Sequence, residues 1–277
     1  MIKNEKIDDG NHLNKRQNSY EVSRIIDNLT LFDDDMMSLV FDKNIPATEL
    51  VLRIILKRDI IVKSVEGQEE YKNPLVGGRD ITLDIHAIDI DGEEIDIEVQ
   101  GNSEGAHVRR ARFHSAMMDS RMLREKDAFN KIKDSYVIFI YKHDKFRKGL
   151  PVYRADRTVL ETGEPLNDGS HIIYVNGKYR GNDDIGKLMQ DFNSSNSNEM
   201  HYKELADSVH HFKETRKGRI IMCEAVKKYA EECKIEDKAM TTLNLMKNMK
   251  WTLEETLDNM GVSDKKERDV IAKLLQE

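Results

Sequence analysis

The chain has 277 residues, of which 34% are charged and only 6% aromatic, and its net charge is −7. Such a length can bury one sizeable core or two small ones, and the acidic balance excludes a protein that is basic over its whole surface, as tight nucleic-acid binders usually are. The amino-terminal stretch lacks the apolar run of a signal peptide, and Cys223 and Cys233 have neither disulfide-scaffold nor zinc-finger spacing, so we expect reduced thiols and a cytoplasmic protein without a membrane span.

The predicted elements begin after a polar amino-terminal stretch. The acidic run 33–35 is interpreted as a solvated turn or helix start. Apolar residues at helical spacing predict a helix over 48–59, with Thr48 as its cap and Glu49 in its first turn. The elements expected next, in chain order, are a strand beginning at 60–63, strands over 79–90 and 94–100, a helix over 105–125, a strand over 135–141, a hairpin turn at 176–177 and a helix over 183–192.

The order of these elements predicts an α/β (α+β) fold. The stretch 135–141, SYVIFIY, is apolar throughout, which is typical of a strand buried on both faces of a mixed sheet. The polar stretch 193–198 predicts a domain edge, and helical patterns fill the chain after it. We therefore expect a polar tail with a helical lead-in over 1–44, a core domain over 45–195 and a helical region over 196–277.

The segment 81–101, ITLDIHAIDIDGEEIDIEVQG, concentrates acidic residues in two strands and the turn between them. Because side chains alternate along a strand, the first strand has one apolar face and one face with Asp84 and His86. The returning strand likewise has one apolar face and one face with Glu98 and Gln100. The chemistry of the segment depends on whether the two polar faces lie on the same side of the sheet.

The length of the turn decides that point. A two-residue loop, Asp91-Gly92, would place Asp84 opposite an apolar residue. A three-residue loop, Asp91-Gly92-Glu93, would place Asp84 opposite Gln100, with the glycine in the left-handed conformation beside a bulge. We therefore predict the three-residue loop, and with it a polar face that carries Asp84, Glu98 and Gln100 together.

Clustered carboxylates repel each other unless they are paired or neutralised. A divalent cation would neutralise them, and oxygen ligands with room for water suit Mg²⁺ or Mn²⁺. Such a cation would lower the pKa of a water molecule and stabilise charge on a phosphate. The alternative is an edge hairpin whose acids face solvent and prevent aggregation. The hairpin alone leaves both interpretations open.

A family resemblance favours the first interpretation. The strand-borne acid, the hairpin and the Glu-x-Gln that follows, within this order of elements, resemble the PD-(D/E)XK nuclease superfamily. More narrowly, LDIHAIDIDGEEIDIEVQ followed by RRARFHSAMMD resembles the recombination-promoting nuclease (Rpn) and transposase family. The resemblance covers about 45–195 and implies a restriction-endonuclease-like core of order αβββαβ. It also implies Mg²⁺- or Mn²⁺-dependent cleavage of DNA, in association with mobile elements and recombination.

The same resemblance assigns roles to individual residues. Asp84 matches the first metal-binding acid and Glu98 the second, and the backbone carbonyl of Val99 is implied as a further ligand. Glu49 matches the additional acid that completes the metal site. Gln100 stands where the superfamily generally has lysine. A glutamine can orient water or phosphate through hydrogen bonds but cannot act as a base near neutral pH.

The helix over 105–125 carries several arginines. Arg112 and Asp119 border its apolar face, whereas Arg109 and Arg110 are expected to point elsewhere. The resemblance implies that Arg112 reaches the scissile phosphate and that Arg109 contacts the DNA backbone, since the planar guanidinium group suits phosphate. The alternative is a solvated helix face with an internal Arg112–Asp119 pair.

Two hypotheses follow for the whole chain. The first is a metal-dependent DNA endonuclease, in which Asp84, Glu98, Gln100 and Glu49 are catalytic. The second is a catalytically inactive nuclease-fold binding or scaffold protein that acts through its helical tail. The acidic net charge and the missing lysine leave room for the second hypothesis. In either case the helices of 200–277 are candidates for homo-oligomerisation.

Overall fold

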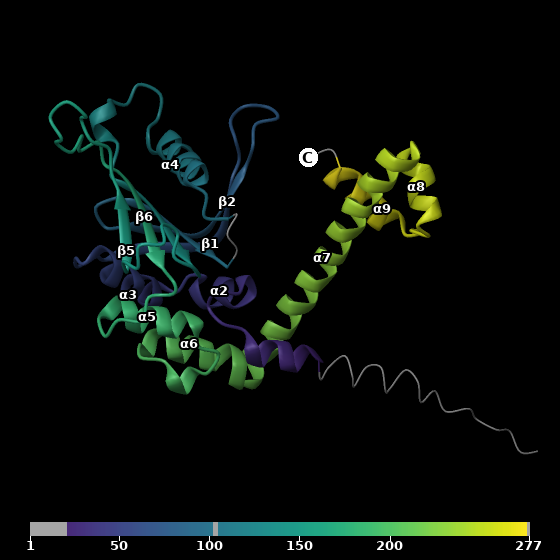
Figure 1. The fold of residues 1–277 in the computed structure, drawn as a ribbon, viewed down its shortest axis with the longest axis horizontal. Coiled ribbons are helices and arrows are strands. Elements are labelled where there is room, and N and C mark those ends of the chain that lie inside the picture. Colours follow the sequence, from purple (N-terminus) through teal and green to yellow (C-terminus); the bar gives the residue numbers. More distant parts are fainter. Residues whose placement is uncertain (1–20, 102–104, 276–277) are drawn as a thin grey trace, which may run out of the picture. The chain divides into compact units, whose positions relative to one another are not determined.

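The computed structural model describes residues 21–101 and 105–275 (Figure 1). The tail predicted over residues 1–20 lies outside the described residues. Residues Arg24–Met222 form the larger of two compact units, and Cys223–Glu277 belong to the other. None of the helices in the described part of the chain is long and apolar enough to cross a membrane.

One six-stranded sheet organises the larger unit. Its strands are β1 (Val62–Tyr71), β2 (Ile81–Asp89), β3 (Glu94–Gln100), β4 (Ser135–Tyr141), β5 (Val152–Ala155) and β6 (Ser170–Asn176). They lie in the order β1-β2-β3-β4-β6-β5, with β3, β4 and β6 mutually parallel and the other pairs antiparallel. Its helices are α2 (Asp34–Phe41), α3 (Ile45–Leu56), α4 (Val108–Met122), α5 (Asp184–Asn193) and α6 (Lys203–Glu214), with short 3-10 turns η1 (Phe129–Lys131) and η2 (Ser197–Glu199). The run α3-β1-β2-β3-α4-β4 confirms the predicted αβββαβ order on a mixed sheet.

The carboxy-terminal part is helical, as predicted. It consists of α7 (Arg216–Met249), α8 (Leu253–Asn259) and α9 (Lys265–Leu274). A small apolar cluster joins the carboxy-terminal half of α7 to α8 and α9, and its buried members are Ala239, Leu257, Val262 and Ile271. The role of these helices in oligomerisation stays a prediction.

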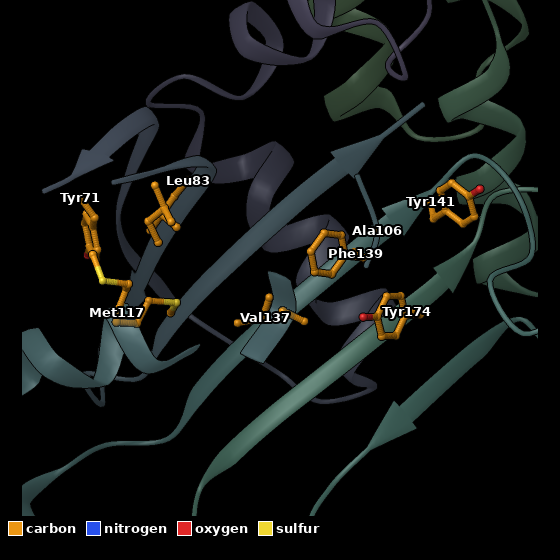
Figure 2. Packing of buried hydrophobic residues seen from close by; sticks show 11 residues of the cluster. Tyr71, Leu83, Ala106, Met117, Val137, Phe139, Tyr141 and Tyr174 are labelled. Carbon is orange, nitrogen blue, oxygen red and sulfur yellow. The ribbon is translucent and has the colours of Figure 1, made fainter. Parts of the chain in front are cut away.

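Strand β4 forms the centre of the core because it has neighbours on both edges and helices on both faces. Its residues 137–140 are completely buried. Helix α4 covers one face, and α2, α3, α5 and α6 lie on the other side of the sheet (Figure 1). Figure 2 shows the cluster beneath α4, where the rings of Phe139 and Tyr174 stack with centroids 5.4 Å apart.

Polar contacts also hold α4 against the sheet. The hydroxyls of Ser115 and Ser170 lie 3.0 Å apart, and the Ser135 hydroxyl donates to Asp119 at 3.0 Å. Asp119 therefore has a partner in the first residue of β4. These contacts fix the position of α4 over β4 and β6, and with it the position of the arginines that α4 carries.

Two local predictions were wrong. Helix α3 begins at Ile45, three residues before the predicted start, because the Asn44 side chain accepts from the Ala47 amide and a proline occupies the first turn. Thr48 therefore lies inside the helix and donates its hydroxyl to the Asn44 carbonyl at 3.0 Å. The turn at 176–177 leads into α5 and not into a returning strand, because β6 already has β4 and β5 as neighbours.

The turn of the acidic hairpin has the predicted length but begins one residue earlier. The Asp89 amide donates to the Glu93 carbonyl at 3.2 Å, so Ile90, Asp91 and Gly92 form the loop. The Asp89 carboxylate fixes this start because it accepts from the amides of Asp91 and Glu93, each at 2.9 Å. Gly92 adopts the left-handed conformation with φ +83°, as the bulged turn requires.

The shifted loop changes the pairing but keeps the faces. Ile85 pairs with Ile97 and His86 with Asp96, so the apolar and polar faces of the two strands coincide as predicted. Continued by one residue, this register places Asp84 opposite Glu98 rather than opposite Gln100. The two acids are therefore direct neighbours across the hairpin.

A core truncation tests this arrangement of layers. We expect Phe139→Ala to lower the free energy of unfolding by about 3–5 kcal/mol, because the ring is completely buried at the centre of the sheet. Chemical denaturation measures the change. Phe129→Ala is the matched control: its ring is 86% exposed, and its effect should stay within about 0.5 kcal/mol. Equal effects of the two variants would contradict the placement of β4 in the core.

Candidate active site

Asp84 of β2 and Glu98 of β3 form the centre of the candidate site. The Asp84 backbone amide donates to Glu98 Oε1 at 3.2 Å, and the Val99 amide donates to Asp84 Oδ2 at 3.0 Å. Each carboxylate is thus held by the backbone of the opposite strand. Glu98 is completely buried, and Asp84 is partly buried. The bulged turn therefore brings together the two acids that the sequence analysis selected.

Gln100 lies beside this pair. Its Nε2 donates to Glu98 Oε2 at 3.3 Å and lies 3.5 Å from Asp84 Oδ2, so one amide group contacts both acids. A side chain at Gly105 would overlap the Gln100 amide oxygen, and the glycine therefore permits the close approach of the backbone. The amide is confined between the acids and the chain that leads into α4.

Helix α4 supplies the positive charge of the site. Arg110 Nη2 lies 2.5 Å from Glu98 Oε2, and the Arg110 Nε donates to the His114 ring at 3.3 Å. His114 Nδ1 in turn lies 2.9 Å from Asp96 Oδ2 and 3.6 Å from Glu98 Oε1. Arg110 was expected to point away from the apolar face of this helix, and that expectation did not identify its contact with Glu98.

The structure does not bring Glu49 to this cluster. Its carboxylate accepts from the Val62 amide at 2.9 Å, at the start of β1. Within residues 21–101 and 105–275, no hydrogen bond or ion pair joins Glu49 to Asp84 or Glu98. A different acid acts on Asp84: burial is the main cause of the raised pKa of Asp84, and the negative charge of Asp34, at the start of α2, raises it further.

His86, on the same polar face as Asp84, is hydrogen-bonded to a carboxylate of β1. Its Nδ1 lies 2.6 Å from Glu69 Oε2, and its ring is buried. Its place on the polar face of β2 therefore extends the network of buried polar groups along the hairpin.

Burial dominates the electrostatics of the cluster. It raises the pKa of Asp84 to about 6, although the hydrogen bond from Val99 and the charge of Arg110 act in the opposite direction. Burial, with the charges of Asp96 and Asp84, raises the pKa of Glu98 well above its usual range. Burial and the Asp84 charge do the same for Asp96. The cluster is thus crowded with carboxylates, and additional positive charge would stabilise it.

The donor atoms fit a divalent cation. Ligand atoms of Asp96, Glu98 and His114 lie within 4.8 Å of one another. Among the residues that the structure describes, Asp96 Oδ1 is buried without a hydrogen-bond partner. Such an orphaned oxygen costs free energy unless a positive group reaches it. Oxygen-rich donor sets suit Mg²⁺ and Mn²⁺, so Glu98 could share a cation with Asp84 across the hairpin or with Asp96 and His114.

A cleft of about 940 Å³ opens beside the acids. Arg79, Arg109, Arg110 and Arg112 line it together with Asp84. Arg109 and Arg112 are exposed, so their guanidinium groups are accessible from solvent. The cleft therefore combines cationic walls with a carboxylate, although the net charge of the whole chain is negative. An elongated polyanion suits such a surface.

The fold and the acids define a nuclease-type domain with an αβββαβ core. Residues 43–179 match the family described as PD-(D/E)XK nuclease family transposase, and this part of the chain belongs to that family. The match includes both acids, Gln100 and the whole of α4. No curated protein and no solved structure matches the chain.

Sequence reasoning missed four residues of the cluster: Asp34, Asp96, Arg110 and His114. Two signals could have found three of them. Asp96 is two residues before Glu98 and therefore shares its face of β3. Arg110 and His114 are four residues apart, so they lie on one side of α4. No pattern in the sequence aligns Asp34 with the hairpin, because only the tertiary fold brings α2 to it.

The raised pKa of Asp84 gives a measurable pH dependence. Its value is about 6 in the folded chain against an ordinary 3.8, so the folded state binds the proton more tightly. The resulting stabilisation is complete below about pH 4 and is lost as the pH rises through 6. In EDTA, we therefore expect Asp84→Asn to exceed the wild type by roughly 2–3 kcal/mol in unfolding free energy at pH 7, with little advantage at pH 4. Urea denaturation at several pH values measures this difference.

Asp91→Asn is the control for this comparison, because it neutralises an exposed acid in the turn of the same hairpin. Its stability should follow the wild-type curve at every pH. If the advantage of Asp84→Asn were the same at pH 4 and pH 7, Asp84 would not be the titrating group.

Proposed function

We propose that the chain is a metal-dependent DNA endonuclease that hydrolyses phosphodiester bonds. The observation that carries the proposal is the Asp84–Glu98 pair, contacted by Gln100 and set beside a cleft lined with arginines. Membership of residues 43–179 in a nuclease family supports it. The residues that would hold Mg²⁺ or Mn²⁺ are Asp84, Glu98 and the Val99 carbonyl. When bound, the cation supplies Lewis acidity for attack by water on the phosphate.

The protein groups have separate tasks in this proposal. Glu98 is kept in place by Arg110 and by the Asp84 amide, so its carboxylate is oriented before substrate arrives. Gln100 donates to Glu98 and can orient a water molecule, but it cannot accept the proton of that water. Arg109 and Arg112 neutralise phosphates along the exposed wall of the cleft.

We also propose Asp34 in place of Glu49 as the additional acid. Asp34 interacts electrostatically with both Asp84 and Arg110, whereas the Glu49 carboxylate accepts from the backbone of β1. Desolvation and the neighbouring Asp33 raise the pKa of Asp34, and Arg110 lowers it. A cation bound between α2 and the hairpin would gain from this third charge.

The finer family placement rests on two features. Glutamine at position 100 follows Glu98 by two residues, and the block RRARFHSAMMD lies within α4. Both favour the recombination-promoting nuclease (Rpn) branch and a cytoplasmic role in DNA rearrangement by mobile elements. The domain over 45–195 would then cleave DNA, and the helical region over 196–277 would assemble copies of the chain.

Cleavage of supercoiled plasmid tests the function. We expect nicking that requires Mg²⁺ or Mn²⁺ and stops in EDTA. The double substitution Asp84→Ala/Glu98→Ala should reduce the nicking rate by more than about a hundredfold, since it removes the proposed ligands themselves. Asp91→Ala, in the same hairpin but outside the cluster, should keep the wild-type rate. Gel quantification of nicked circles against time gives the rates.

Two other outcomes would each contradict the proposal. Folded protein without nicking in any metal would favour the binding or scaffold function. Equal nicking by the wild type and the double variant would place the activity elsewhere or in a contaminant. A thermal shift on addition of Mn²⁺, lost in the double variant, reports metal binding separately from cleavage.

The cleft arginines give a second test. We expect Arg109→Ala and Arg112→Ala each to weaken DNA binding at any sequence and to reduce the slope of log affinity against log salt by about 0.9 per lost phosphate contact. Fluorescence anisotropy over a salt series measures both quantities. Arg124→Ala is the matched control, because Arg124 is exposed but lies outside the cleft. An equal effect at Arg124 would point to nonspecific attraction and not to the cleft.

A further inference from the structure

The connection between β1 and β2 carries two exposed apolar side chains beside the cleft. We call residues 72–80, KNPLVGGRD, the β1–β2 tip. Leu75 is 73% exposed and Val76 is fully exposed. The connection extends past the sheet on the side where α4 lies (Figure 1). Exposed leucine and valine at the end of a projecting hairpin are unfavourable in water, which raises the question of what they contact.

The β1–β2 tip is internally braced. Asp80 accepts from the Asn73 amide at 2.7 Å and from Lys72 Nζ at 2.9 Å. The Leu75 amide donates to Asn73 Oδ1, and the Gly78 amide closes a turn on the Leu75 carbonyl, both at 2.9 Å. This turn holds Leu75 and Val76 outward in a defined conformation. Their insertion into a partner would therefore cost little conformational entropy.

The tip is also fixed to α4. The Arg121 guanidinium group lies 4.2 Å from the centre of the Tyr71 ring and donates to the Lys72 carbonyl at 2.7 Å. Helix α4 carries three of the arginines that line the cleft. The apolar side chains and these arginines therefore belong to one rigid assembly, so a ligand held by the arginines meets the tip at a fixed place.

Arg79 connects the tip to the cleft directly. It lines the cleft together with Asp84 and lies three residues from Val76. Three residues span at most about 11 Å of chain. That length corresponds to about three base-pair steps, at about 3.4 Å per step. A duplex whose phosphate lies against Arg79 would thus present its base steps within reach of Val76.

We propose, on the basis of the nuclease function proposed above, that Leu75 and Val76 form a wedge that inserts from the minor groove between base pairs of duplex DNA, close to the phosphate to be cut. Apolar side chains flanked by arginine are the means by which proteins unstack and kink DNA from that groove. Two side chains offer far less area than the roughly 800 Å² per partner of a stable protein interface, which favours a base step over a partner protein. The wedge selects deformable steps, such as TA and CA, and mismatched pairs.

A second exposed apolar tip provides a control for this proposal. Leu160 is 89% exposed in the connection between β5 and β6, but it does not line the cleft. Exposure alone would make the two tips equivalent. The wedge proposal assigns DNA distortion to the β1–β2 tip only.

The experiment uses full-length protein that carries Asp84→Asn to prevent cleavage, and duplexes with 2-aminopurine at a TA step. Binding is measured by anisotropy and unstacking by the rise in 2-aminopurine fluorescence. We expect binding of the parent protein to increase the fluorescence. Leu75→Ser/Val76→Ser should abolish the increase and remove most of the preference for a TA or mismatched site over a GC-rich one, with affinity reduced roughly tenfold. Leu160→Ser should match the parent in every measurement.

The outcomes separate this proposal from the nuclease function. If the parent binds DNA and the wild type cleaves it, but Leu75→Ser/Val76→Ser unstacks the step as well as the parent does, the wedge is overturned and the nuclease stands. If the double variant and Leu160→Ser lose the signal equally, the effect is general and the wedge is again overturned. Absence of both DNA binding and plasmid nicking in the protein with Asp84 intact would overturn the two proposals together. Circular dichroism of each variant establishes that it is folded.

Discussion

The complete burial of the Glu98 carboxylate is the constraint on which the site depends. A buried charge is costly unless it is paired and hydrogen-bonded. The structure meets this requirement from two directions: the Asp84 amide reaches Glu98 across the hairpin, and Arg110 reaches it from α4. A helix without a cation at that position could not cover this face of the sheet. The acid therefore determines what α4 must carry, as well as serving as a candidate ligand.

The position of α4 follows from the same balance between apolar packing and polar pairing. Over β4 and β6 the helix packs on the cluster around Phe139, and over β3 it places Arg110 and His114 on the acids. The burial that stabilises the apolar contacts of α4 with β4 and β6 also raises the pKa values of Asp96 and Glu98 on β3. The buried carboxylates therefore offset part of the stability that the apolar core provides, and a bound divalent cation would recover it.

The sequence predicted the order of elements, the strands and the pair Asp84 and Glu98 because alternation along a strand is a local property. A three-residue turn followed from the requirement that the polar faces of the two strands coincide. The residue at which the turn starts depended on the Asp89 side chain, which accepts hydrogen bonds from two amides of the turn. Arg110 could not be chosen over Arg112 from the sequence, since the rotation of α4 is set by packing on β4 and β6. Asp34 could not be chosen over Glu49 for a similar reason: both precede the sheet, and only the fold decides which helix end approaches Asp84.

Because Gln100 carries no charge, the positive charge beside Glu98 comes from Arg110 on α4. A lysine at position 100 would place a positive charge within reach of Asp84 and Glu98, whereas the amide of Gln100 brings hydrogen bonds and no charge. Arg110 supplies a cation to Glu98 from the helix instead, and a guanidinium group stays charged at any physiological pH. Because Arg110 cannot deprotonate, it stabilises the carboxylate without competing for the proton of an attacking water. The charge of Arg110 therefore opposes, without cancelling, the rise that burial causes in the pKa of Glu98, and proton removal is left to groups other than residues 100 and 110.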